Sequence, residues 1–132
     1  MNIPLSVHVV YNERSENCAN IYSAIYKLLC RDSRDPFSDG LDIPVYPVIT
    51  SDDYPIQPVH TERSKRNFVL LLIDEAMYRS EQSRKYVADL VELERSGKIV
   101  IYPVSLCKYA FEFNNDLQFK QFISLKSTSV LD

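Results

Sequence analysis

Carboxylate side chains gather on a segment with helical periodicity in the second half of the chain. Asp89 is central, with Glu81, Glu92 and Glu94 nearby. A carboxylate held in a cleft can stabilise the positive charge that develops when a glycosidic bond breaks. Two structural alternatives stay open: a solvated acid on the helix surface, or an ion-pair partner of Lys85, four residues earlier. Glu92, one turn further on, is the second candidate for the catalytic role.

Motifs for other common chemistries are not found in the sequence. The only two glycines, Gly40 and Gly97, lie in no phosphate-binding pattern, which argues against a Rossmann or Walker site but not against every nucleotide-binding mode. His8 lies in an apolar stretch and is predicted to be a buried core histidine. His60 stands alone in a polar stretch, so no metal site is expected.

Composition limits the class of protein. The 132 residues form one domain, predicted over residues 1–125, with a patternless tail at 126–132 that could begin a linker to a further domain. A net charge of -3 disfavours nucleic acid as a partner. The apolar runs are too short to span a membrane, and the start has no signal-peptide pattern. Three cysteines, outside any CxxC pattern, fit reduced thiols in the cytoplasm.

Two unbroken apolar runs, residues 68–73 and 99–104, are typical of parallel strands buried on both faces. The segment between them has helical periodicity over residues 83–96, and Gly97 suits the position just after that helix. Together they predict a right-handed βαβ unit.

The first half of the chain predicts a strand over residues 5–11, a helix to about residue 30 and a short strand over residues 43–48. Pro44 and Pro47 favour an edge position for that short strand, because proline cannot donate to a strand ladder. A further strand is possible at residues 122–125. The predicted fold class is α/β: a flavodoxin-like open parallel sheet of about five strands, in the order 2-1-3-4-5, with helices on both faces.

Ligands bind beyond the carboxyl ends of the strands in such a sheet. Tyr11, Asn12 and Arg14 follow the first strand, and a proline-bounded loop follows the second. That loop is predicted to be long and exposed, either functional or plain surface.

Three stretches resemble elements of TIR (Toll/interleukin-1 receptor) domains of the bacterial kind. The first is the strand at residues 7–11 with its polar turn, and the second is the Arg-Asn-Phe-Val-Leu-Leu-Leu-Ile run at residues 66–73. The third is the Lys-Tyr-Val-Ala-Asp-Leu helix at residues 85–90, followed by Gly-Lys-Ile-Val-Ile-Tyr-Pro-Val at residues 97–104. The likeness covers about residues 5–106.

The resemblance implies one of two functions. Some TIR domains cleave the nicotinamide–ribose bond of NAD⁺, and others assemble with further TIR domains as scaffolds. The expected function is that of an intracellular domain of a prokaryotic, antiphage-type immune protein, acting as an NAD⁺ hydrolase or cyclase after self-association. NAD⁺ would be its substrate, and no cofactor is expected. Its partners would be further copies of the TIR domain and other domains of a longer chain. No binding to a membrane is expected. The alternative is a catalytically silent module for homotypic assembly.

The resemblance also assigns residues. The essential glutamate of the enzymatic members falls on Asp89, eight residues before Gly97, and Tyr86 stands where the family usually has a tryptophan. Aspartate is one methylene shorter, and a misplacement of about 1 Å can cost about 100-fold in rate.

Substrate contacts are expected from Tyr86 and from the first turn, where Tyr11 and Asn12 lie and where Arg14 could bind a pyrophosphate by paired hydrogen bonds. An exposed structural turn is the alternative. The family's gating and self-association loop corresponds to four residues after the second strand: Ser51, Asp52, Asp53 and Tyr54.

A response-regulator receiver shares this topology and is a third possibility. It needs an acidic pair after the first strand and an aspartate ending the third strand. Asp74 satisfies the second requirement, but the first turn, Asn12-Glu13-Arg14, carries one acid only.

Overall fold

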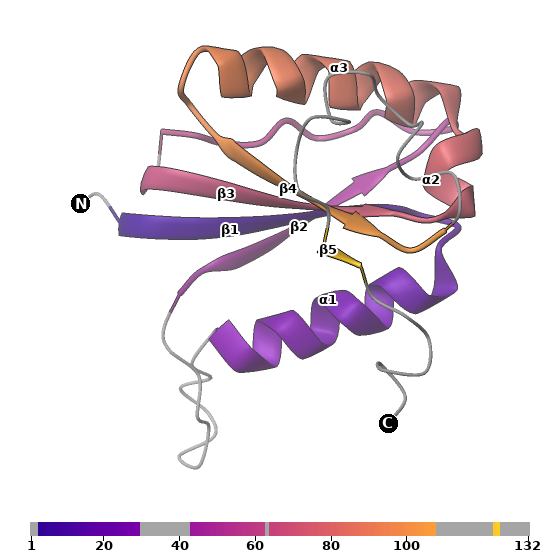
Figure 1. The fold of residues 1–132 in the computed structure, drawn as a ribbon, viewed down its shortest axis with the longest axis horizontal. Helices are drawn as coiled ribbons and strands as arrows, with labels where there is room; N and C mark the ends of the chain where they lie inside the picture. Colours follow the sequence, from indigo (N-terminus) through magenta and orange to yellow (C-terminus); the bar gives the residue numbers. More distant parts are fainter. Residues whose placement is uncertain (1–2, 30–42, 63, 108–122, 125–132) are drawn as a thin grey trace.

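A parallel sheet forms the centre of the computed structural model, which describes residues 3–29, 43–62, 64–107 and 123–124 (Figure 1). Strand β1 (Ile3–Asn12) lies between β2 (Val45–Thr50) and β3 (Ser64–Ile73), and β4 (Val100–Ser105) pairs with β3. All four pair in parallel, in the order β2-β1-β3-β4. The predicted α/β class and this strand order are confirmed, and the arrangement is consistent with a flavodoxin-like fold.

The fifth strand differs from the prediction. Only two residues, β5 (Ile123–Ser124), pair in parallel with the end of β4. The remaining positions of the predicted strand, 122 and 125, lie outside the described residues, as does the predicted tail at 126–132. Within the described residues the sheet therefore has four strands of substantial length, and not five.

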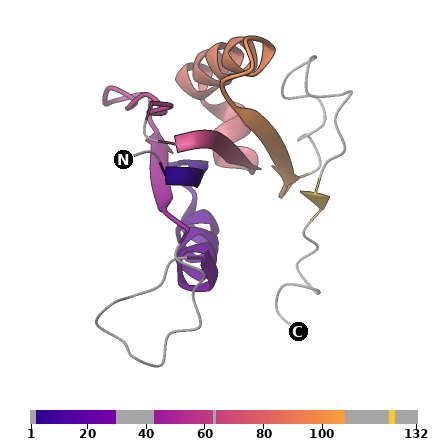
Figure 2. The same ribbon diagram turned by 90° about the vertical axis from the view of Figure 1, so that its left-hand side faces the viewer.

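Helices cover both faces of the sheet, as predicted (Figures 1 and 2). Helix α1 (Glu16–Leu29) packs on one face, while α2 (Glu75–Arg79) and α3 (Glu81–Arg95) lie on the other. The apolar positions of α3 that face the sheet are buried: Val87, Leu90 and Val91. None of the helices in the described parts of the chain is long and apolar enough to cross a membrane.

Strand β3 is apolar without alternation because both of its faces are covered. Leu71 and Ile73 belong to the core beneath α3, and Leu72, between them, belongs to the core beneath α1. All three are at most 1% exposed. The strand begins four residues earlier than predicted, with Lys65 and Arg66 exposed at its amino end.

Strand β2 lies at the sheet edge, as its prolines predict. It begins two residues later than predicted, since Pro44 precedes it and contributes only its carbonyl, which accepts from the amide of Val7. Pro47 stands opposite Val9. The alternation of a parallel ladder then points the nitrogen of Pro47 to the free edge, where a missing donor costs nothing.

Two short signals set the boundaries of the helices that follow β3. Asp74 caps α2, its carboxylate accepting from the amide of Met77 at 2.9 Å, and Ser80 caps α3 by accepting from the amide of Ser83. The helix predicted over 83–96 therefore begins at Glu81, with α2 as an extra turn before it. At its end Gly97 has a φ of +82°, and its amide donates to the Glu94 carbonyl, so its predicted position is confirmed.

His8 is a buried core histidine, as predicted. Its side chain is 2% exposed, its Nε2 lies 3.2 Å from Asn67 Oδ1, and its ring stacks on Tyr46. Burial lowers the pKa of His8, with the nearby His60 acting in the same direction and the Asn67 hydrogen bond opposing them. The fold therefore favours the neutral ring.

This burial predicts a loss of stability in mild acid. Below pH 6.5 the unfolded chain protonates His8 while the folded chain resists, so the free energy of unfolding should fall as the pH falls towards the lowered pKa of the folded state. One proton limits the slope to about 1.4 kcal/mol per pH unit. Urea unfolding at pH 7.5 and 5.5 measures it. His8→Gln should flatten the slope, whereas His60→Gln, at an exposed position, should retain most of it; equal slopes in the parent and His8→Gln would contradict the expectation.

Candidate functional site

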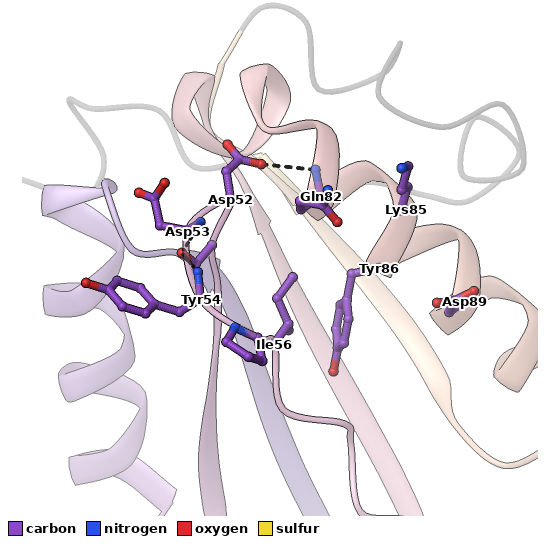
Figure 3. Close-up of a pocket in the computed structure, with 10 residues that line it drawn as sticks. Asp52, Asp53, Tyr54, Ile56, Gln82, Lys85, Tyr86 and Asp89 are labelled. Atoms are coloured by element: carbon purple, nitrogen blue, oxygen red, sulfur yellow. Dashed lines mark hydrogen bonds between the residues drawn. The ribbon is translucent and has the colours of Figure 1, made fainter.

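A pocket of about 480 Å³ lies between α3 and the loop that follows β2 (Figure 3). Two segments, about thirty positions apart in the sequence, supply its lining. The loop contributes Ser51, Asp52, Asp53, Tyr54, Pro55 and Ile56, and the helix contributes Gln82, Lys85, Tyr86 and Asp89. All four predicted loop residues and two of the predicted site residues, Tyr86 and Asp89, thus share one cavity.

The helical wall arises from the period of α3. Its four lining residues are spaced i, i+3, i+4 and i+7, which places them along one side of the helix, while Val87 and Leu90 turn towards the sheet. Asp89 is exposed to this cavity and to solvent. Lys85, one turn away, forms no ion pair with it, because the ion pairs of the described residues join other partners. The ion-pair alternative for Asp89 is therefore not what the structure contains.

Tyr86 joins the two walls of the pocket. Its hydroxyl donates to the carbonyl of Gln57 at 2.7 Å, so α3 holds the far end of the loop. Burial, together with the neighbouring Asp89 carboxylate, raises the pKa of Tyr86 to about 12. Tyr86 is thus a protonated hydrogen-bond donor at neutral pH, close enough to Asp89 to sense its charge.

Ser51 organises the near end of the loop. It is buried, and its hydroxyl accepts from the amides of Asp53 and Tyr54 at 3.0 and 3.1 Å. The same hydroxyl donates to the Glu13 carboxylate at 2.9 Å. The prolines keep this loop out of regular secondary structure, so its amides bond to a side chain instead. Asp52, Asp53 and Tyr54 are exposed, as predicted, with Tyr54 at 70%.

Asp52 ties the loop to the beginning of α3. One of its oxygens, Oδ1, accepts from the Ser80 hydroxyl at 2.9 Å and from the Gln82 amide at 3.1 Å. Figure 3 shows the carboxylate of Asp52 directed at Gln82. The sequence predicted neither bond, because Asp52 and Gln82 are thirty positions apart.

Tyr11 and Asn12, the last two residues of β1, do not line this pocket. Asn12 is 2% exposed and donates to Thr50 and Ser83, so its amide belongs to a buried polar cluster. Tyr11 is 7% exposed and packs in the core beneath α1, where its ring meets Tyr22. The structure thus gives Tyr11 and Asn12 supporting contacts, and their role as substrate contacts stays a prediction.

Arg14 lies at the rim instead. Its guanidinium is exposed and lies 3.6 Å from the Asp53 carboxylate. Its amide donates to Asn12 Oδ1, which fixes the backbone of the turn. An exposed ion pair of this kind contributes little to stability. The side chain therefore remains available to an anionic ligand.

Asp89 lies further from the carboxyl ends of the strands than predicted. The cleft was expected at the carboxyl ends of the strands, where the buried Ser83 hydroxyl contacts Thr50 at 2.7 Å. Asp89 follows Ser83 by six residues, or about 9 Å along the helix. It faces the loop after β2, as predicted, but the turn after β1 is not part of its pocket.

Glu92 is a weaker candidate than Asp89 on this geometry. It does not line the pocket, and its carboxylate lies 2.6 Å from the Arg95 guanidinium. Gln82 and Ile56, which do line it, were missed by the sequence interpretation. The spacing of Gln82 from Tyr86 and Asp89 was the available signal, since it repeats the i, i+4, i+7 pattern.

The described residues contain no group of three or more histidine, cysteine or acidic side chains placed to bind a metal ion. Comparison of the chain with models of protein families, with curated proteins and with solved structures finds no match. The resemblance to TIR domains therefore rests on the sequence motifs and stays a prediction.

Proposed function

We propose that this chain is a TIR-like domain that cleaves the nicotinamide–ribose bond of NAD⁺, with Asp89 as its essential carboxylate and a flavodoxin-like sheet as its scaffold. One observation carries the proposal. The loop residues Ser51–Tyr54 and the helix residues Tyr86 and Asp89, which the resemblance assigns to one site, line a single pocket. The setting proposed with it is cytoplasmic, in a prokaryotic antiphage-type immune protein.

The chemistry requires a carboxylate close to a developing cation. When the bond breaks, its electron pair leaves with nicotinamide, and the ribose becomes an oxocarbenium ion. The Asp89 carboxylate would stabilise this charge, and water or an internal nucleophile would then attack the sugar carbon. Tyr86 stays protonated, since its pKa is raised to about 12, and can donate a hydrogen bond beside the ribose.

The charges of the site fit the two ends of such a substrate. The lining carries three carboxylates, Asp52, Asp53 and Asp89, and Asp89 is the one proposed to lie beside the cationic nicotinamide ribose. Lys85 is the cation of the lining, and Arg14 lies at the rim on Asp53. These two side chains are the candidates for the pyrophosphate.

Direct assay tests the proposal. The protein, held at high concentration or clustered on beads, is incubated with NAD⁺ and analysed for released nicotinamide, with ADP-ribose and its cyclic form resolved as products. We expect more than one nicotinamide to be released per protein molecule, in an amount that increases with time and with protein concentration. Absence of turnover under clustering would overturn the catalytic proposal.

Homotypic assembly without catalysis is the second candidate, and Tyr54 favours it. Tyr54 is 70% exposed on its loop, so its ring offers apolar surface to a second copy of the domain. If the loop joins copies of the domain, Tyr54→Ser should lower the sedimentation coefficient at high concentration. Tyr26→Ser, on α1 and 42% exposed, is the matched control and should sediment like the parent.

A further inference from the structure

The pocket beside Asp89 has only two walls, and they belong to different elements. Every lining residue comes either from the loop at 51–56 or from α3. Helix α3 is held by the sheet through its buried face. The cavity therefore exists only while the loop lies against the helix, and the contacts between loop and helix decide whether it is formed.

Those contacts lie at the two ends of the loop segment. At the first end Asp52 accepts from Ser80 and from Gln82. At the second end the Tyr86 hydroxyl donates to Gln57. Between them Ile56 packs against the core cluster beneath α3. In Figure 3 Asp52 lies near the start of the helix, and Asp89 lies furthest along it.

We propose that Asp52 is a positioning residue: its carboxylate latches the loop at 51–56 onto the start of α3 and so keeps the pocket beside Asp89 formed. The latch is a property of the fold and does not depend on the proposed reaction. The effect on turnover described below does rest on the proposed function.

The geometry explains why a carboxylate is needed. Both donors meet the same oxygen, Oδ1, and one of them is a first-turn amide of α3. First-turn amides have no partner within their helix and carry the positive end of the helix dipole, so an anionic acceptor is preferred there. Hydrogen bonds to a charged group are about twice as strong as neutral ones. Asparagine would retain an acceptor oxygen without the charge.

Ser51 orders the turn that carries Asp52. Ser51, adjacent to Asp52, accepts from the amides of Asp53 and Tyr54. Neither amide bonds to Asp52 itself. Their hydrogen exchange therefore reports whether the turn around Asp52 stays ordered, and not merely whether one bond to Asp52 is lost.

Amide hydrogen exchange of the full chain tests the latch. In Asp52→Ala, the Asp53 and Tyr54 amides should exchange about tenfold faster or more, the size expected for loss of a charge-assisted bond. Asp52→Asn should give an intermediate rate. Asp74→Ala is the matched control, because Asp74 caps α2 through the Met77 amide without touching the loop. It should accelerate exchange near Met77 and leave the Asp53 and Tyr54 amides at the parent rate.

Unchanged exchange of these two amides in Asp52→Ala would overturn the latch, and so would equal acceleration in Asp74→Ala. If the parent releases nicotinamide, Asp52→Ala should raise KM about tenfold with a smaller change in kcat, because the pocket must first be assembled. A parent without turnover would remove the catalytic proposal and leave the exchange result standing. A parent with turnover but unchanged loop exchange would remove the latch alone.

Discussion

Replacing Leu71 with alanine should lower the free energy of unfolding by about 2–5 kcal/mol. Leu71 is 0% exposed, stands between Val10 and Pro103 in the sheet, and packs in the core cluster beneath α3. Alanine removes most of its buried surface and leaves a cavity that a central strand cannot close by moving, because β3 is paired on both sides. Urea unfolding followed by circular dichroism measures the change.

Leu28→Ala is the matched control for Leu71. The chemistry of the substitution is the same, but Leu28 is 69% exposed on α1. Its effect should stay below about 1 kcal/mol, since little burial is lost and alanine favours helix. A loss below about 1 kcal/mol for Leu71→Ala would show that the centre of β3 is not core.

Asp89→Ala should abolish nicotinamide release and leave the fold intact. Asp89 is exposed in the pocket and not ion-paired with Lys85, so its removal costs little stability. Its loss would leave the oxocarbenium ion without its nearest carboxylate, an effect of at least about 100-fold on kcat for an electrostatic group of this kind. Thermal melts of both proteins check the fold, and chromatography of nicotinamide checks the activity.

Two further variants separate the carboxylates. Glu92→Ala should retain activity, because Glu92 pairs with Arg95 outside the pocket. Asp89→Glu should keep or raise the rate, since its longer stem matches the glutamate of the enzymatic TIR domains. Full activity in Asp89→Ala would assign the reaction to Glu92 or to another carboxylate and would sink the role given to Asp89.

The strands and the edge position of β2 were predictable because each depends on local chemistry. An apolar run such as residues 68–73 is removed from water only where both faces of the strand are covered. Prolines such as Pro47 exclude a central position in the sheet. Gly97 marks a helix end because it adopts a positive φ at low cost. The helix boundaries differ from the prediction by a few residues, because several polar residues were possible N-caps and the structure uses Asp74 and Ser80.

The pocket was predictable only in part of its membership. Motif order assigned Tyr86, Asp89 and the loop after β2 to one site, and the spacing on α3 placed the helix residues along one side. Nothing local specifies that Asp52 meets Gln82 or that Tyr86 meets Gln57, because these bonds join segments about thirty positions apart.

Tertiary structure also decided the fate of the turn after β1. The sequence Asn12-Glu13-Arg14 predicts an exposed polar turn. Asn12 is nevertheless buried, and its side-chain amide donates to Thr50 and Ser83. A short polar side chain is stable in water and also in the interior if it is hydrogen-bonded there. Whether it is buried depends on whether the fold brings donors and acceptors from distant segments within reach. Sequence by itself thus determined the four long strands and the two long helices, whereas only packing of α3 over the sheet decided which polar groups are core and which line the pocket.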